Sequence, residues 1–188
     1  MKNLEQHVKH RDSCIFRPVF CLHWFEAGEV CEEKILFKDY NDHLITFHEN
    51  NDHLDREDEE LDEWIASFKI EEADWKKYQA WSPMEILDTD GNLFYTVGCI
   101  ANKSFNFMIV FYGSPKKAKR FSCTCSLENK DGEKFSYTGK IHTLDEKKDE
   151  IIASDSLFKI GKNAVMRSLD EDSDFEITFT ISEEKTGY

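Results

Sequence analysis

The 188-residue sequence has few cations, and it has no long apolar run. It contains 24 Lys and Arg against 38 Asp and Glu, which gives a formal net charge of −14. Because proteins bind the phosphate backbone with cations, we expect no nucleic acid among the partners. No apolar run approaches the roughly 20 residues of a membrane-spanning helix, so we expect no membrane interaction. The first residues, 1–7, do not resemble a signal peptide, and we therefore expect a cytoplasmic protein, with the nucleus as the alternative.

Sequence motifs of common enzymes are also missing. We find no Gly-x-Ser-x-Gly nucleophile elbow, no P-loop and no Gly-x-Gly-x-x-Gly phosphate-binding loop. His142 is the only histidine after His53, so a Cys/His dyad in the C-terminal part would have to pair it with Cys99, Cys123 or Cys125. Thiols that face an apolar core stay protonated and unreactive, and we expect these three to be packing residues. No catalytic residue is predicted, and enzymatic activity stays open.

What the sequence does have is a pair of strongly patterned strands around a short basic turn. The segment 105–112 is apolar on both faces, which is typical of a strand that is covered on both sides. The turn 113–120 carries a glycine, a proline and four cations. In the segment 121–127, Phe, Cys, Cys and Leu alternate with Ser and Thr, which predicts a strand with one buried face.

Similar patterns predict further strands, at 64–68, 92–100, 134–141, 157–160 and 175–181, with less regular strand signals at 73–85 and 150–155. The segment 88–91 is predicted to be a hairpin turn, and 162–169 a helical turn. Many short strands at this spacing, with little helix between them, predict a mainly β fold in which residues 64–188 form an antiparallel β-sandwich.

The N-terminal residues 1–51 are rich in cysteine and histidine. Cys21, Cys31, His43 and His48 follow one another with nine, eleven and four intervening residues. Two thiolates before a short helix that carries two imidazoles supply the four tetrahedral donors of a zinc site, and 38–50 is the predicted helix. The gap between the cysteines is wider than in most such sites, so the alternative is that the cysteines pack as small apolar residues and the histidines are surface residues.

An acidic segment, residues 52–63, separates this region from the predicted sandwich. Such a dense run of like charge is typical of a solvated linker. It lacks the glycine and the alternating ligands of an EF-hand calcium loop. We therefore predict three parts: an N-terminal zinc region, an acidic linker and a C-terminal sandwich.

Several phrases resemble the seven-in-absentia (Sina/Siah) family of RING-type E3 ubiquitin ligases. His10-x3-Cys14-Ile-Phe-Arg-Pro18-x2-Cys21 and the Cys31, His43, His48 spacing are similar to its zinc-finger region. The basic turn is similar to a Gly-x-x-x-x-Ala-x-x-Phe turn of its TRAF-like substrate-binding domain. Phrases at 154–157 and 177–182 follow in the family's order, so the resemblance covers about residues 10–182.

The resemblance implies roles for particular residues. Cys21, Cys31, His43 and His48 would be the four zinc ligands of the family's second finger. His10 and Cys14 match only the latter half of the first finger, whose cysteines have no counterpart here, so they form at most a remnant metal half-site. Asp74 and Trp75 match an Asp-Trp pair of the family's peptide-binding groove, with an ordinary core tryptophan as the alternative for Trp75.

The function implied by this resemblance is substrate recognition for a ubiquitin ligase: binding of target-protein peptides for ubiquitination and proteasomal degradation. The module is expected to be a homodimer that binds Zn²⁺ and substrate peptides. The 188 residues contain no RING, so contact with the E2 and ubiquitin machinery would go through a RING-bearing partner. The alternative is a RING-less TRAF/MATH-like interaction scaffold or a dominant-negative dimerisation partner. A zinc hydrolase is disfavoured, because a four-ligand Cys/His site leaves no position for water.

Overall fold

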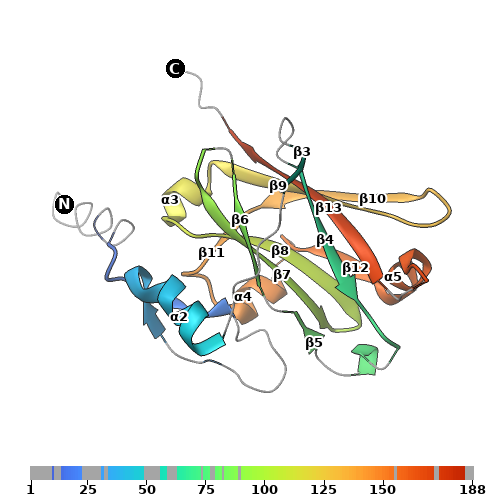
Figure 1. Cartoon of the computed structure of the whole chain (residues 1–188), viewed down its shortest axis with the longest axis horizontal. Coiled ribbons are helices and arrows are strands. Elements are labelled where there is room, and N and C mark those ends of the chain that lie inside the picture. Colours follow the sequence, from blue (N-terminus) through green and yellow to red (C-terminus); the bar gives the residue numbers. More distant parts are fainter. Residues whose placement is uncertain are drawn as a thin grey trace.

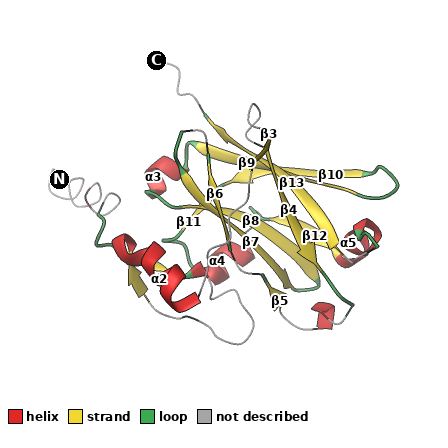
Figure 2. Ribbon diagram, viewed as in Figure 1, coloured by secondary structure: helices red, strands yellow, loops and turns green. Residues whose placement is uncertain are grey.

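The structure is a computed structural model, and it describes residues 10, 14–22, 31, 34–48, 56–58, 63–72, 74–76, 79–81, 83–88, 90–154, 156–171 and 174–184. Strands dominate this part of the chain (Figure 2), which confirms the predicted mainly β fold. Two larger sheets form the body of the molecule, and a small N-terminal unit lies beside them (Figure 1). None of the helices described here is long and apolar enough to cross a membrane.

The first large sheet is antiparallel throughout and has five strands. Their order is β10 (Lys134–Lys140), β9 (Phe121–Glu128), β13 (Asp174–Glu183), β4 (Glu63–Lys69) and β3 (Arg56–Asp58). Strand β3 lies within the predicted acidic linker, whose residues 52–55 and 59–62 are outside the described part of the chain. Part of this acidic segment therefore extends a sheet edge.

The second large sheet is built on a central hairpin of β7 (Leu93–Ala101) and β8 (Ser104–Phe111). Asn102 and Lys103 form its two-residue turn with positive φ angles of 53° and 62°, as the twist of a tight hairpin requires. Beside β7 lie β5 (Gln79–Ala80) and β6 (Met84–Leu87), and beside β8 lie β12 (Phe158–Gly161) and, in parallel, β11 (His142–Thr143). All pairs except β11–β8 are antiparallel.

The two sheets face each other across an aromatic core. From the second sheet, Phe105 and Phe107 enter this core, and from the first sheet Phe68, Phe175 and Phe179 meet them. The rings of Phe68 and Phe105 are 5.0 Å apart and those of Phe105 and Phe175 are 4.8 Å apart, both edge to face. The predicted inward faces of 121–127 and 175–181 are buried here, so these two strand predictions are confirmed.

The opposite face of the second sheet is also covered, by the N-terminal unit together with Leu144, Ile151 and Leu157. This unit consists of β1 (Pro18–Phe20) paired with β2 (Lys34–Leu36), the 3₁₀ turn η2 (Phe37–Asp39) and helix α2 (Tyr40–His48). Its buried side chains form one cluster with the outward side chains of β7 and β8, which are Tyr95, Val97, Cys99, Met108 and Val110. The strand at 105–112 is apolar on both faces because each face packs in a different core.

Short helical turns connect the strands. The basic turn contains α3 (Pro115–Ala118), whose Ser114 side chain accepts a hydrogen bond from the Lys117 amide. The weak strand signal at 73–85 becomes η3 (Asp74–Lys76) followed by β5 and β6. The predicted hairpin turn at 88–91 joins β6 to β7, with Gly91 at a φ of +75°. The helical turn predicted at 162–169 is α5 (Lys162–Ser168).

One strand prediction is wrong. Residues 150–155 were predicted to extend as a strand, but the chain forms helix α4 (Lys148–Ala153) there, and Ile151 is buried. The physical reason is that the flank of β8 is already occupied by β11 at one end and β12 at the other. Because β11 runs parallel to β8 and β12 antiparallel, the chain must reverse between them, and one amphipathic helical turn achieves this.

Candidate metal centre

The four predicted ligands converge in the N-terminal unit. Cys21 directly follows β1, Cys31 precedes β2, and His43 and His48 lie on α2. Their sulfur and imidazole nitrogen atoms all lie within 4.8 Å of one another, and among the described residues they form a group able to hold a metal ion. Cys21 and His43 are buried, and Cys31 and His48 are half-buried.

The contacts between these donors surround a common centre. Cys21 Sγ is 3.3 Å from His48 Nε2, and Cys31 Sγ is 3.5 Å from His43 Nε2. The two Nε2 atoms are 3.2 Å apart. Four side chains that contribute two thiols and two imidazoles at this separation suit one tetrahedral ion rather than four independent packing residues.

Local structure explains how four residues with such uneven spacing in the sequence come together. The pairing of Phe20 with Lys34 places the end of β1 against the start of β2, so the wide gap between the cysteines is spanned across a hairpin. His43 and His48 are five residues apart, which on an ideal helix puts them about 140° apart. His48 is the last residue of α2, and there its ring meets that of His43 edge to face, with centroids 5.0 Å apart.

Three tyrosines attach the N-terminal unit, which carries the four candidate ligands, to the second sheet. Tyr40 is fully buried, its hydroxyl accepts a hydrogen bond from the Leu22 amide at 3.1 Å, and burial raises its pKa well above the usual value. Tyr95 on β7 donates to the Asn41 side chain at 2.9 Å, and Tyr112 donates to a backbone carbonyl of η2 at 2.9 Å. The positions flanking the ligands are thus fixed by the sheet.

Arg17 ties the same unit to two loops of the sandwich. Its guanidinium is 6% exposed and stacks 3.7 Å from the centre of the Phe37 ring. It donates to the Gly113 carbonyl at 2.8 Å, to the Asp145 carboxylate at 3.2 Å and to the Cys14 carbonyl at 3.3 Å. A buried, charged side chain with its donors used in this way holds the module in one position. Neither Arg17 nor the tyrosines could be recognised from a sequence motif, and the only signal for them was a second apolar face on β7 and β8.

The other residues singled out from the sequence lie elsewhere. His10 is exposed and Cys14 is half-buried, and neither belongs to the four-residue group. Asp74 and Trp75 lie in η3, just before edge strand β5. The Asp74 carboxylate accepts a hydrogen bond from the Glu71 amide at 2.8 Å.

Trp75 is 8% exposed and belongs to the aromatic core, as its alternative reading predicted. Its indole Nε1 is nevertheless buried without a hydrogen-bond partner among the described residues. The amine of Lys162 lies 5.9 Å from the centre of the Trp75 ring.

His142 forms a hydrogen-bonded array that superficially resembles a hydrolase site. Its Nδ1 is 3.1 Å from Glu146 Oε2, and its Nε2 is 3.2 Å from Ser156 Oγ. Ser156 Oγ is also 2.6 Å from Ser154 Oγ, which donates to the Ile151 carbonyl. These hydrogen bonds join β11 to the end of α4. Since His142 is completely buried, the array does not present a nucleophile to solvent.

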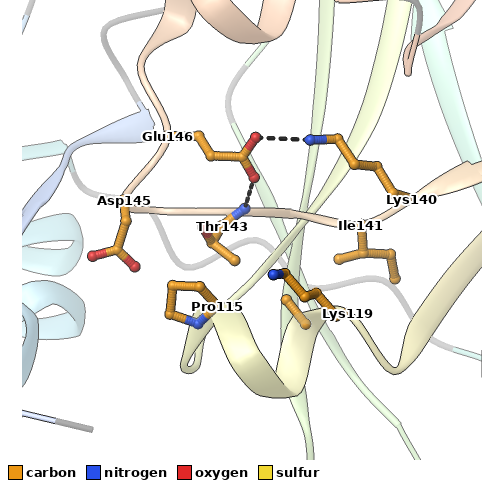
Figure 3. Close-up of a pocket in the computed structure, with 8 residues that line it drawn as sticks. Pro115, Lys119, Lys140, Ile141, Thr143, Asp145 and Glu146 are labelled. Atoms are coloured by element: carbon orange, nitrogen blue, oxygen red, sulfur yellow. Dashed lines mark hydrogen bonds and ion pairs between the residues drawn. The ribbon is translucent and has the colours of Figure 1, made fainter. Parts of the chain in front are cut away.

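Glu146 is the charged end of this array. Burial by itself would raise its pKa, but the hydrogen bond and charge of His142, followed by those of Lys140, lower the pKa to about 2. Figure 3 shows the carboxylate between the Lys140 amine and the backbone amide of Thr143, both at 3.0 Å. The adjoining cavity of about 310 Å³ has Lys119 and Pro115 on its opposite wall.

The three remaining predicted packing cysteines are all buried. Cys123 and Cys125 point into the aromatic core with their sulfurs 3.4 Å apart. The hydrogen bond with Cys125 and burial raise the pKa of the Cys123 thiol. The contacts of His142 are with Glu146 and Ser156. They do not support a catalytic Cys/His dyad with Cys99, Cys123 or Cys125.

Comparison with known proteins gives no family assignment: no protein-family model matches the chain, and no curated protein matches its sequence.

Proposed function

We propose that the chain is a zinc-stabilised protein-interaction module that binds extended peptide segments of other proteins. Zinc at about 2.3 Å from sulfur and 2.0–2.1 Å from nitrogen places a tetrahedral sulfur–nitrogen pair about 3.5 Å apart and two nitrogens about 3.3 Å apart. The contacts in the Cys21, Cys31, His43 and His48 group are 3.3 and 3.5 Å for sulfur–nitrogen and 3.2 Å for nitrogen–nitrogen. The donor set and its spacing both fit zinc.

The role proposed for this zinc is structural. Four protein side chains complete a tetrahedral shell, so no position is left for a water molecule or a substrate. The group also lies in a unit that is packed onto a sheet rather than at the base of a cleft. A zinc ion here would hold β1, β2 and α2 together, and the chemistry of the ion itself would not be used.

The observation that carries peptide binding is the indole nitrogen of Trp75, which is buried without a hydrogen-bond partner among the residues that the structure describes. A buried donor without an acceptor costs about 1–3 kcal/mol, so such groups call for an explanation. Trp75 lies in η3, a few residues before β5, and β5 and β6 are the outermost strands on that side of the sheet among the described residues. A peptide strand added at this edge could form main-chain hydrogen bonds with it, and a small shift of η3 that uncovers Nε1 would let the peptide offer it a backbone carbonyl. Asp74 would then be a positioning residue for the turn that carries Trp75.

Within this class of module, the resemblance to the seven-in-absentia family favours substrate recognition for a ubiquitin ligase. The bound peptide would belong to a protein that is ubiquitinated and degraded. A RING-bearing partner would supply the contact with the E2, and the module would act as a homodimer. Support for this finer assignment comes from the Cys/His spacing and the Asp74–Trp75 pair.

Peptide binding can be tested without knowledge of the natural target. Random peptides are selected on the wild-type protein by phage display, and the best peptide is measured by fluorescence anisotropy. Trp75→Phe, which keeps a ring but removes Nε1, is expected to weaken binding about tenfold or more, the loss of a hydrogen bond worth roughly 1.4 kcal/mol. Trp81→Phe is the matched control, since Trp81 is a half-buried neighbour that packs on Phe68 and Phe105. Equal affinities for wild type and Trp75→Phe would remove the assignment.

The ligase assignment needs a separate assay. The selected peptide is fused to a reporter protein and incubated with E1, E2, ubiquitin, a RING-bearing seven-in-absentia ligase and this chain. Ubiquitin transfer to the reporter that depends on this chain, and is lost with Trp75→Phe, is the expected result. Peptide binding without any such transfer would leave an interaction scaffold and rule out the ligase role.

A further inference from the structure

A groove lies between the N-terminal unit and the sandwich, away from Trp75. It has a volume of about 600 Å³, within the range of typical ligand-binding pockets. Its walls come from η2 on one side and from the hairpin strands and the basic turn on the other. The lining includes Phe37, Leu87, Leu93, Phe111, Tyr112 and Lys117. We call this the inter-module groove.

The inter-module groove is distinct from the Trp75 edge. It borders the start of β7 at Leu93, whereas β5, which follows Trp75, pairs with Cys99 and Ile100 near the end of β7. Cys99 and Ile100 are six and seven residues after Leu93, and at about 3.3 Å per residue the two surfaces lie roughly 20 Å apart along β7. Figure 1 shows α3 and β5 at opposite ends of the second sheet.

Exposed apolar side chains line the inter-module groove or are adjacent in sequence to residues that line it. Leu87 on its rim is 58% exposed. Phe16 and Leu36 are 59% and 39% exposed and directly precede Arg17 and Phe37, which both line the groove. Large apolar side chains that remain exposed next to an apolar hollow mark an interaction surface.

The charges beside this groove indicate the chemistry of its partner. Lys116 and Lys117 of α3 have no carboxylate partner in the part of the chain that the structure describes. The Lys117 amine donates to the Asn92 side-chain oxygen and lies 5.7 Å from the centre of the Phe111 ring, so it is held at the groove without being neutralised. Two such cations in one turn stand out in a chain with a net charge of −14. Asp88, which follows the groove residue Leu87 in the chain, has its carboxylate engaged, since it accepts hydrogen bonds from the Asp90 and Asn92 amides.

We propose that the inter-module groove docks an acidic segment of a partner protein, in which large apolar side chains enter the groove and flanking carboxylates pair with Lys116 and Lys117. The apolar lining supplies the contact area, and complementary charge selects and orients the segment. This surface is additional to the peptide edge at Trp75. It includes residues of both modules, so it exists only while the N-terminal unit is docked on the sheet.

The test uses a short fluorescein-labelled peptide that has leucine and phenylalanine at its centre and aspartate and glutamate on both sides. Wild-type protein is expected to bind this probe saturably, with an affinity that falls as salt is added. Leu87→Ser and the double variant Lys116→Glu/Lys117→Glu are each expected to weaken binding about tenfold. Leu87, Lys116 and Lys117 are all exposed, and only Lys117 gives up a side-chain hydrogen bond, to Asn92, so the fold should persist, and circular dichroism checks this.

Matched controls separate docking from general attraction. Ile45→Ser changes a similarly exposed residue on α2 (53%), and Lys130→Glu/Lys134→Glu reverses two exposed charges elsewhere. Both controls, and Trp75→Phe, should bind the probe like wild type. Absence of saturable binding would overturn the proposal. The same holds if the groove variants bind normally, if the Lys130/Lys134 control weakens binding as much as the Lys116/Lys117 variant, or if Trp75→Phe abolishes binding.

Discussion

Loss of the metal site should unfold the sandwich as well as the N-terminal unit. The perturbation is Cys31→Ser, chosen because Cys31 is half-buried, so the new hydroxyl does not have to enter the core. Structural zinc contributes an apparent 10–16 kcal/mol to small sites, roughly equal to or above the total stability of about 5–15 kcal/mol of an ordinary domain. Without it, β1, β2 and α2 should not stay folded.

The consequence for the sheet follows from the second core. When the N-terminal unit unfolds, four large side chains that are at most 3% exposed lose the part of their cover that this unit supplies, namely Tyr95, Val97, Met108 and Val110, while Leu144, Ile151 and Leu157 of the same cluster remain. At about 1.5–3 kcal/mol for each side chain, the cost of exposure has an upper bound of about 6–12 kcal/mol. That is comparable to the whole stability of the chain, so the two sheets should not survive alone.

The assay measures zinc per chain by atomic absorption and follows thermal unfolding by near-ultraviolet circular dichroism of the aromatic core. Wild type is expected to carry one zinc and to unfold in a single transition. Cys31→Ser should lack zinc and lose the cooperative aromatic signal. Cys14→Ser is the control, because Cys14 lies nearby but outside the four-residue group, and it should keep both. A zinc-free Cys31→Ser protein with the wild-type melting temperature would refute the coupling.

Two further predictions concern the sandwich itself. The pKa of Glu146 is lowered from 4.5 to about 2, so its carboxylate stabilises the fold above pH 4.5 by about 1–2 kcal/mol after allowance for solvent screening, and this is lost as the pH falls toward 2. Glu146→Gln should therefore be less stable than wild type in urea at pH 7, with a difference that shrinks in acid; a pH-independent difference would contradict this. A Cβ at Gly98 would lie 2.5 Å from Phe68 in the packed core, so Gly98→Ala should cost about 1–3 kcal/mol in urea unfolding, and an unchanged midpoint would show that Phe68 can move aside.

Much of the fold could be predicted from local pattern. Alternation at 121–127 and 175–181 identified buried strand faces, because successive side chains of a strand point to opposite sides. The Cys/His spacing identified the four converging residues for a similar reason, since a turn and a short helix bring such positions together. The error at 150–155 arose where two isoleucines suit a strand or a helical turn equally well.

The sequence by itself determined which faces are apolar and which residues can bind a metal. Only the tertiary structure decided what covers the second face of β8, how Arg17 joins three segments and where a groove remains between the two units. The physical reason is that periodicity reports the polarity of each position locally. The contacts of Arg17 with Gly113 and Asp145 span about a hundred residues, and they depend on how the completed surfaces fit.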